Sequence, residues 1–184
     1  MEKHIQAPLD PSEIRTLKAG DYVYITGTIY TARDAAHKRI YETILSGNGS
    51  IPIDLKNNVI YYMGPSPARE GRPIGSAGPT TSSRMDKYTP MLLDRGLKGM
   101  IGKGKRSDDV KDAIVKNGAV YFAAVGGAGA LLSKAITSSE VIAYDDLGTE
   151  AIRKLHVEDF PAVVVIDSDG NDLYKTAVEK YRQI

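Results

Sequence analysis

The fold is decided by one stretch, Ala119-Val120-Tyr121-Phe122-Ala123-Ala124-Val125, which is a continuous apolar run. Such a run without polar alternation is typical of a strand that is covered on both faces. A second run, Ala162-Val163-Val164-Val165-Ile166-Asp167, has the same character and predicts another buried strand. Strands of this kind indicate a sheet with helices packed against it.

The residues around these two runs alternate between helical and extended patterns. Helices are predicted at residues 127–136 and 149–155 and at the terminal residues 177–182, with a strand at 141–144. In the first half, strands are predicted at 5–8, 22–30, 58–63 and 97–101, and helices begin at 10, 33, 89 and 107. This alternation predicts an α/β fold with a largely parallel or mixed sheet.

Composition places the chain among globular proteins. Its 184 residues fit one domain, 1–184, and 42 % of them are apolar. The formal net charge of +1 gives no indication of a nucleic-acid or membrane surface. No run approaches the roughly 18–20 apolar residues of a membrane span, and the first residues form no apolar signal core, so we expect a cytoplasmic location.

Cysteine is absent from the chain. That excludes disulfides, thiol catalysis and an iron–sulfur cluster held by cysteines of this chain. The three histidines, His4, His37 and His156, are far apart in sequence and form no visible zinc motif.

The stretch Gly78-Pro79-Thr80-Thr81-Ser82-Ser83-Arg84-Met85-Asp86 is the first candidate site. Gly and Pro predict a sharp loop, and the hydroxyl residues that follow are typical of a helix entrance, which attracts anions. Arg84 adds a guanidinium that fits a carboxylate or phosphate with two parallel hydrogen bonds. Thr80 and Arg84 could therefore serve one small anion. The alternative is an ordinary helix cap beside a solvated arginine.

Further cations precede other predicted helices. Arg33 stands at a strand-to-helix junction, where Asp34 could cap the helix or orient Arg33. Lys103, Lys105 and Arg106 precede the helix start at 107, although the helix dipole disfavours cations there. Such a conflict with local stability indicates function, whereas the alternative is a solvated loop tip.

Together these positions predict a site for a small dianion such as a dicarboxylate, provided that their loops converge. The candidates are three cations and one hydroxyl: Arg33, Thr80, Arg84 and Lys103.

Six segments, in order and over nearly the whole chain, resemble the iron–sulfur (class I) fumarases in their C-terminal domain or separate β subunit. The β subunit of L(+)-tartrate dehydratase is similar to the same degree. The segments are Ala32-Arg33-Asp34-Ala35-Ala36-His37, Ile60-Tyr61-Tyr62-Met63-Gly64-Pro65, Gly78 to Asp86 as quoted above, Lys103-Gly104-Lys105-Arg106-Ser107, Tyr121-Phe122-Ala123-Ala124-Val125-Gly126-Gly127 and Val157-Glu158-Asp159-Phe160-Pro161.

The resemblance implies a swivelling β/β/α domain and a reversible hydratase that converts fumarate to malate. It implies a 4Fe–4S cluster carried by a cysteine-bearing α subunit, in an assembly of two α and two β subunits, with no cofactor held by this chain alone. Thr80 matches the family's catalytic threonine, Arg33 and Arg84 match arginines that hold the substrate carboxylates, and Lys103 matches a lysine near the substrate. Two departures are Lys105, where asparagine is expected in many members, and Gly102, where alanine is frequent.

Three functions therefore compete. The first is the β subunit of a two-chain fumarase, and the second is the same role in L(+)-tartrate dehydratase. The third is a module that binds an anion or a partner and does no chemistry.

Overall fold

The computed structural model describes residues 2–125 and 127–182, so Gly126 of the segment quoted above lies outside the described residues. The strands are β1 (Glu2–Ala7), β2 (Tyr22–Thr31), β3 (Val59–Tyr61), β4 (Gly99–Gly102), β5 (Val120–Ala123), β6 (Ile136–Ala143) and β7 (Ile152–Ile166). The α-helices are α1 (Pro11–Ile14), α2 (Asp34–Ser46), α3 (Thr89–Asp94), α4 (Asp108–Asn117), α5 (Gly129–Leu132) and α6 (Leu173–Tyr181). Three 3-10 helices are η1 (Ser82–Met85), η2 (Ser133–Ala135) and η3 (Asp145–Glu150).

The described strands form one mixed sheet in the order β1-β2-β3-β4-β5-β7-β6. Strands β1 to β5 pair in parallel, whereas β7 runs antiparallel to β5, β6 and β2. Because β7 pairs with both β5 and β2, the strands β2-β3-β4-β5-β7 close into a barrel-like ring. The predicted α/β fold with a mixed sheet is confirmed, but a largely parallel sheet is not, since β7 contributes three antiparallel pairings.

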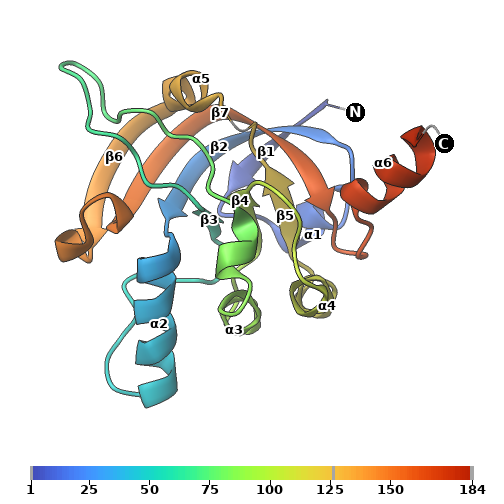
Figure 1. Cartoon of the computed structure of the whole chain (residues 1–184), viewed down its shortest axis with the longest axis horizontal. Coiled ribbons are helices and arrows are strands. Elements are labelled where there is room, and N and C mark those ends of the chain that lie inside the picture. Colours follow the sequence, from blue (N-terminus) through green and yellow to red (C-terminus); the bar gives the residue numbers. More distant parts are fainter. Residues whose placement is uncertain (1, 126, 183–184) are drawn as a thin grey trace.

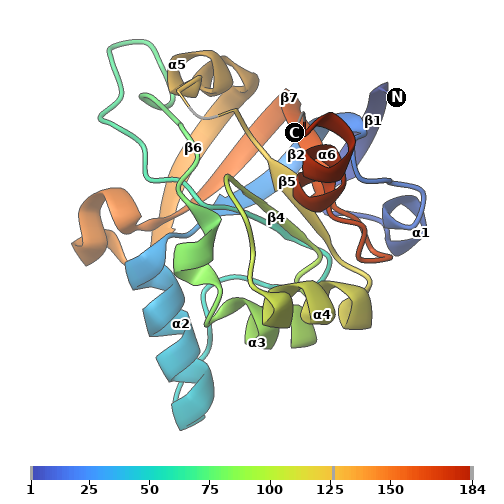
Figure 2. The ribbon, with the colours of Figure 1, turned by 45° about the vertical axis from the view of Figure 1, so that its right-hand side comes forward.

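Two hydrophobic clusters bury the two faces of the sheet. Val120 and Phe122 of β5 belong to the cluster inside the ring, whereas Tyr121 belongs to the cluster beneath α2, α3 and α4. These three helices lie together along one side of the sheet, with α5 on the opposite side (Figure 1 and Figure 2). The centre of the apolar run at 119–125 is thus a strand covered on both faces, as its sequence predicts, whereas Val125 beyond the strand is exposed.

The helix predicted at residues 149–155 is wrong. The 3-10 helix η3 ends at Glu150, and the chain then extends as β7, which also contains the strand predicted at 162–167. Ile152 and Leu155 have helical spacing. From Lys154 to Val157, however, exposed and buried residues alternate, which is typical of a strand. Pairing with β2 on one side and β6 on the other outweighs the local helical pattern.

Residues 127–136 also differ from the prediction. Only Gly129–Leu132 is α-helical, and Ile136 already begins β6, which includes most of the strand predicted at 141–144. The terminal helix predicted at 177–182 begins earlier, because the Asp172 side chain caps α6 by accepting a hydrogen bond from the Tyr174 N–H. No helix within the described ranges is long and apolar enough to cross a membrane.

Candidate functional site

The carboxyl ends of three neighbouring parallel strands form the candidate site. Strands β2, β3 and β4 pair in this order, and Arg33, Gly64 and Lys103 follow their respective ends. Parallel strands deliver the residues that follow them to the same edge of a sheet, where open α/β folds bind ligands. The topology therefore brings segments together that are far apart in sequence.

The segment that contains Thr80 lies against the ends of β3 and β4. The Thr80 N–H donates to the Tyr62 carbonyl at 2.7 Å, and the Ser82 N–H donates to the Lys103 carbonyl at 2.9 Å. Thr81 and Lys103 form a parallel bridge between these hydrogen bonds. Thr80 and Lys103 are therefore held on adjacent backbone segments, as the convergence of loops requires.

Thr80 is not a helix cap. The helix that follows is the short 3-10 helix η1, its N-cap residue is Thr81, and Thr81 makes no side-chain capping hydrogen bond. Thr80 is half-buried. The alternative of an ordinary N-cap is thus wrong for this residue, which removes the simplest structural explanation for its hydroxyl.

Each candidate arginine has an acidic neighbour from another element. Arg84 pairs with Asp34, and its side chain keeps 52 % of its surface exposed. Arg33 places its Nε atom 4.0 Å from a Glu150 carboxylate oxygen. Asp34, predicted to cap the helix or orient Arg33, instead holds Arg84. Since Asp34 directly follows Arg33, this pair joins η1 to the start of α2 and brings the two arginines to the same place.

Gly64 shapes the wall behind Arg33. A Cβ atom at Gly64 would lie 2.8 Å from both Arg33 Nη1 and the Thr149 carbonyl oxygen, so only glycine leaves room for the guanidinium. With Lys103 exposed nearby, the group contains three cations and two carboxylates, which leaves a formal charge of +1. Such a group favours an anion. Asp34 orients Arg84 through a hydrogen bond, whereas the buried Arg33 Nε atom has no hydrogen-bond partner among the described residues and only lies near Glu150.

His37 lies beneath the site and is fully buried. Burial lowers the pKa of His37 to about 4, and the nearby Arg106 charge adds to this effect, while the Arg33 carbonyl opposes it. The Nδ1 atom lies 2.9 Å from the Arg33 carbonyl oxygen and therefore donates to it when the imidazole is neutral. His37 thus supports the backbone at Arg33, although the sequence placed both residues on one helical face.

The three cations at 103–106 differ in environment. Lys103 and Lys105 are exposed, but the side chain of Arg106 is 0 % exposed and its Nε atom donates to Asp86 at 2.7 Å. The alternative of a solvated loop tip is therefore wrong for Arg106.

A side chain has little room at Gly102, where the resemblance leads us to expect alanine in many members. A Cβ atom at Gly102 would lie 2.0 Å from Ser82 Oγ and 2.8 Å from a Tyr62 ring carbon. Ser82 Oγ is itself held at 2.8 Å from the Tyr121 hydroxyl. Ser82 and Tyr62 therefore limit the space at Gly102 in this chain.

Sequence reasoning missed Glu150, Asp86 and Gly64. Glu150 lies within the segment 149–155 that was wrongly predicted as helix, so its approach to Arg33 had no local signal. Asp86 and Gly64 stand inside the quoted motifs, but their roles depend on side chains from other elements.

The described residues offer no metal centre. Within them, no group of three or more His, Cys, Asp or Glu side chains could hold a metal ion, and the sequence contains no cysteine. The residues present therefore do not fit a cysteine-ligated iron–sulfur cluster on this chain.

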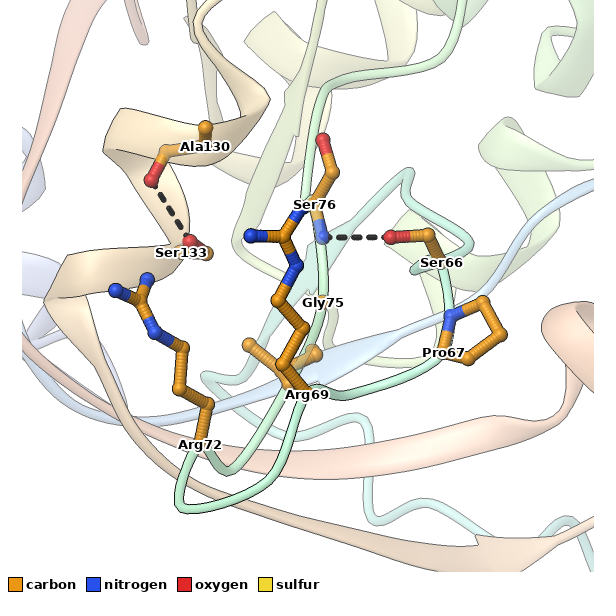
Figure 3. Close-up of a pocket in the computed structure, with 9 residues that line it drawn as sticks. Ser66, Pro67, Arg69, Arg72, Gly75, Ser76, Ala130 and Ser133 are labelled. Atoms are coloured by element: carbon orange, nitrogen blue, oxygen red, sulfur yellow. Dashed lines mark hydrogen bonds between the residues drawn. The ribbon is translucent and has the colours of Figure 1, made fainter.

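A cavity of about 190 Å³ lies elsewhere, between the 64–80 segment and the start of η2. Arg69 and Arg72 extend along it toward Ser133, and Ser66 Oγ accepts a hydrogen bond from the Ser76 N–H at 2.8 Å (Figure 3). None of the four candidate residues lines this cavity.

These features define a class: a closed, mixed α/β domain that presents cations and a hydroxyl at one strand edge, suited to a small anion. Comparison with known sequences identifies a particular family within this class. The chain belongs to the Fumarase C-terminus family, which matches residues 2–177.

Three relatives illustrate the similarity. The chain is 44 % identical over 158 residues to the anaerobic class I fumarate hydratase of Escherichia coli K12, which covers 85 % of the chain and 29 % of that protein. It is 39 % identical over 174 residues to fumarate hydratase 2 of Leishmania major, covering 92 % of the chain and 30 % of that protein. It is 36 % identical over 178 residues to a Methanocaldococcus jannaschii protein provisionally named L(+)-tartrate dehydratase subunit beta, covering 94 % of the chain and 91 % of that protein. The chain thus spans less than a third of the two fumarate hydratases.

Proposed function

We propose that the chain is the β subunit of a two-chain iron–sulfur hydro-lyase that reversibly hydrates fumarate to malate. One observation carries the proposal: the segment with Thr80 and Arg84 docks on both the Lys103 strand end and the Arg33–Asp34 turn. Membership of the Fumarase C-terminus family and the similarity to two fumarate hydratases support the reaction class.

In this proposal the cations bind the two substrate carboxylates. Arg33 and Arg84 offer planar guanidinium groups that match a carboxylate with two hydrogen bonds, and Lys103 adds a point charge. Their charge also stabilises the additional negative charge that develops on a carboxylate during hydration of the double bond. Thr80 carries the proton. A threonine hydroxyl is a weak base by itself, so the neighbouring cations must lower its pKa in the assembled site.

The proposal assigns the 4Fe–4S cluster to a cysteine-bearing α subunit, with two copies of each subunit assembled in the cytoplasm. The sequence supports this division, because a chain with no cysteine needs its cluster ligands from elsewhere.

A second candidate is the β subunit of L(+)-tartrate dehydratase. The observation that favours it is the alignment with the M. jannaschii protein, which extends over 91 % of that protein. Tartrate is also a four-carbon dicarboxylate, so the same cations would bind it.

Co-expression of the chain with a cysteine-bearing α subunit, under anaerobic conditions, tests the proposal. We expect the complex to hydrate fumarate, which is measured as a decrease in the ultraviolet absorbance of fumarate. We expect the isolated chain to be folded but inactive. Dehydration of L(+)-tartrate with no fumarate turnover would assign the second candidate.

The third possibility is a module that binds anions without chemistry. Titration of fumarate or malate into the isolated chain distinguishes it, with Arg84→Lys as the control. Submicromolar binding to the wild-type chain alone, lost in the variant, would favour this module.

A further inference from the structure

Arg106 lies behind the candidate site, and its contacts reach several segments. Its Nε atom donates to Asp86 at 2.7 Å, and Nη2 donates to Thr89 Oγ1 at 2.9 Å and to the Tyr62 hydroxyl at 3.2 Å. Nη1 lies 3.6 Å from the sulfur of Met100. One buried guanidinium therefore connects the 103–107 loop to the end of η1, to α3 and to the residue after β3.

Asp86 binds both Arg106 and the next residue, Ser107, and we call this group of Asp86, Arg106 and Ser107 the clasp. One carboxylate oxygen accepts from Arg106, and the other accepts from the Ser107 N–H at 2.7 Å. Asp86 stands two residues after Arg84, and Arg106 stands three residues after Lys103. The clasp thus joins the loop that carries one candidate ligand to the loop that carries another.

Aromatic residues fix the clasp from both sides. The guanidinium carbon lies 5.2 Å from the ring centre of Tyr62 and 4.9 Å from that of Tyr121. The Tyr121 hydroxyl donates to the Gly104 carbonyl at 2.8 Å, inside the same loop. These contacts require a planar, forked cation, which lysine cannot replace.

The position of Arg106 is not explained by local stability. A cation just before the N-terminus of α4 opposes the helix dipole, and a buried ion pair is weak evidence for stability because desolvation offsets its attraction. What the pair does achieve is a side-chain connection that reinforces the backbone bridge between Thr81 and Lys103.

We propose that Arg106 is a positioning residue, which fixes Arg84 and Lys103 relative to each other without touching the substrate. This inference rests on the proposed function, since it assigns both residues to substrate carboxylates.

The first test is kinetic and uses the complex of the chain with its α subunit. In Arg106→Lys we expect KM for fumarate to rise about 10- to 100-fold, because small misplacements of binding groups have effects of this size. Combined with Arg84→Lys, the effects should be less than multiplicative, since Arg106 acts through Arg84. The control is Lys111→Met, which breaks the mostly buried pair between Lys111 and Asp172 at 2.7 Å. It should lower the melting temperature and leave KM unchanged.

The second test needs no enzymatic activity. In the full chain, hydrogen exchange of the Ser82 and Arg84 amides should accelerate in Arg106→Lys, while amides in β1 and β7 keep wild-type rates. If Arg106→Lys does not fold, Asp86→Asn weakens the same clasp and should give the same pattern with smaller changes.

The outcomes separate the two proposals. If the wild-type complex is inactive but the variants show the expected exchange pattern, the proposed function is overturned, whereas the structural role of the clasp is retained. An active wild-type complex whose Arg106→Lys and Asp86→Asn variants keep KM, with only a lower melting temperature, overturns the positioning role.

Discussion

Two regions of the molecule each place arginines beside hydroxyl groups, but they differ in construction. At the edge of β2, β3 and β4, Arg33 and Arg84 have carboxylate neighbours from other elements, Glu150 and Asp34. In the cavity beside η2, Arg69 and Arg72 are exposed, and no carboxylate lines the walls. The arginines of the first region come from different elements, whereas both arginines of the second stand on one loop.

This difference bears on ligand binding. A guanidinium held by a carboxylate has lost its rotamer freedom before a ligand arrives, so less entropy is lost on binding. Exposed arginines on a loop must be ordered by the ligand itself. We therefore expect the strand edge, and not the cavity beside η2, to bind the substrate, and the following predictions test that contrast.

The largest expected effect is at Thr80. In the complex with the α subunit, Thr80→Ala should lower kcat by about 10²–10⁴-fold with little change in KM, because an acid–base group acts mainly in the transition state. Thr80→Ser keeps the hydroxyl and should retain substantial activity. The matched control in the cavity is Ser66→Ala, which also removes a hydroxyl and should leave kcat unchanged.

A Thr80→Ala complex with wild-type kcat would contradict the proton-carrier role. Equal losses of kcat in Thr80→Ala and Ser66→Ala would contradict the contrast between the two regions.

The second prediction concerns His37, which lies beneath the strand edge, and the pH dependence of the stability of the chain. His37 has a pKa of about 4 in the folded chain and 6.5 as its ordinary value, so the unfolded chain binds more protons between these two pH values. Stability is therefore lost as the pH falls from about 6.5 to about 4, by on the order of 3 kcal/mol. Urea unfolding at pH 7, 5.5 and 4.5 measures this loss, and His37→Phe should reduce it.

The control for His37 is His4, which is exposed and pairs with Asp159 at the surface. His4→Gln should leave the pH dependence close to that of the wild type. Identical pH dependence in His37→Phe and the wild type would mean that His37 is not buried in its neutral form.

The sequence predicts those elements whose pattern is local. The centre of the run at 119–125 is apolar because both faces of β5 are covered, and the Ser107 cap and Gly118 that delimit α4 are short-range signals. Residues 149–155 were predicted wrongly because the first part of β7 is extended through its pairing with β2 and β6. That pairing is not visible in the apolar spacing of residues 149–155 themselves. Closure of the ring by β7 has the same origin and also had no local signal.

The candidate site also combines features that are visible in the local sequence with features that depend on distant segments. The residue types at Arg33, Thr80 and Arg84 and the loops that carry them are visible in the sequence. Parallel pairing brings the ends of β2, β3 and β4 to one edge, and backbone hydrogen bonds of Thr80 and Ser82 hold their segment against it. The acidic partners are not visible in this way. Asp34 binds Arg84 rather than Arg33, and Glu150 arrives from a segment 117 positions after Arg33 (150 − 33), so only the folded chain identifies these pairs.

The third prediction compares arginines directly. Arg84→Lys keeps the charge but loses the fork, and loss of a charge-assisted hydrogen bond should weaken substrate binding by roughly 1.5–3 kcal/mol. The expected result is a KM raised about 10- to 100-fold in the complex, with an unchanged melting temperature. Arg69→Lys in the cavity should leave KM at the wild-type value. The contrast fails if Arg69→Lys raises KM as much as Arg84→Lys does.

The smallest expected effect compares two glycines, one in each region. A Cβ atom at Gly102 meets Ser82 Oγ at 2.0 Å, whereas a Cβ atom at Gly75 meets the carbonyl oxygens of Ser66 and Pro67 at 2.2 and 2.5 Å. Both Gly102→Ala and Gly75→Ala should therefore lower the free energy of unfolding, each by about 1–3 kcal/mol.

The two glycines should differ in rescue. Ser82→Ala removes the oxygen that opposes a Cβ atom at Gly102, so the double variant should recover part of the loss, although the Tyr62 ring carbon at 2.8 Å remains. Ser66→Ala cannot rescue Gly75→Ala, because the backbone carbonyl oxygens stay in place. Urea unfolding of the four single and two double variants, compared with the wild type as two double-mutant cycles, measures the coupling. Strictly additive effects at positions 82 and 102 would show that a neighbour other than Ser82 excludes the methyl group.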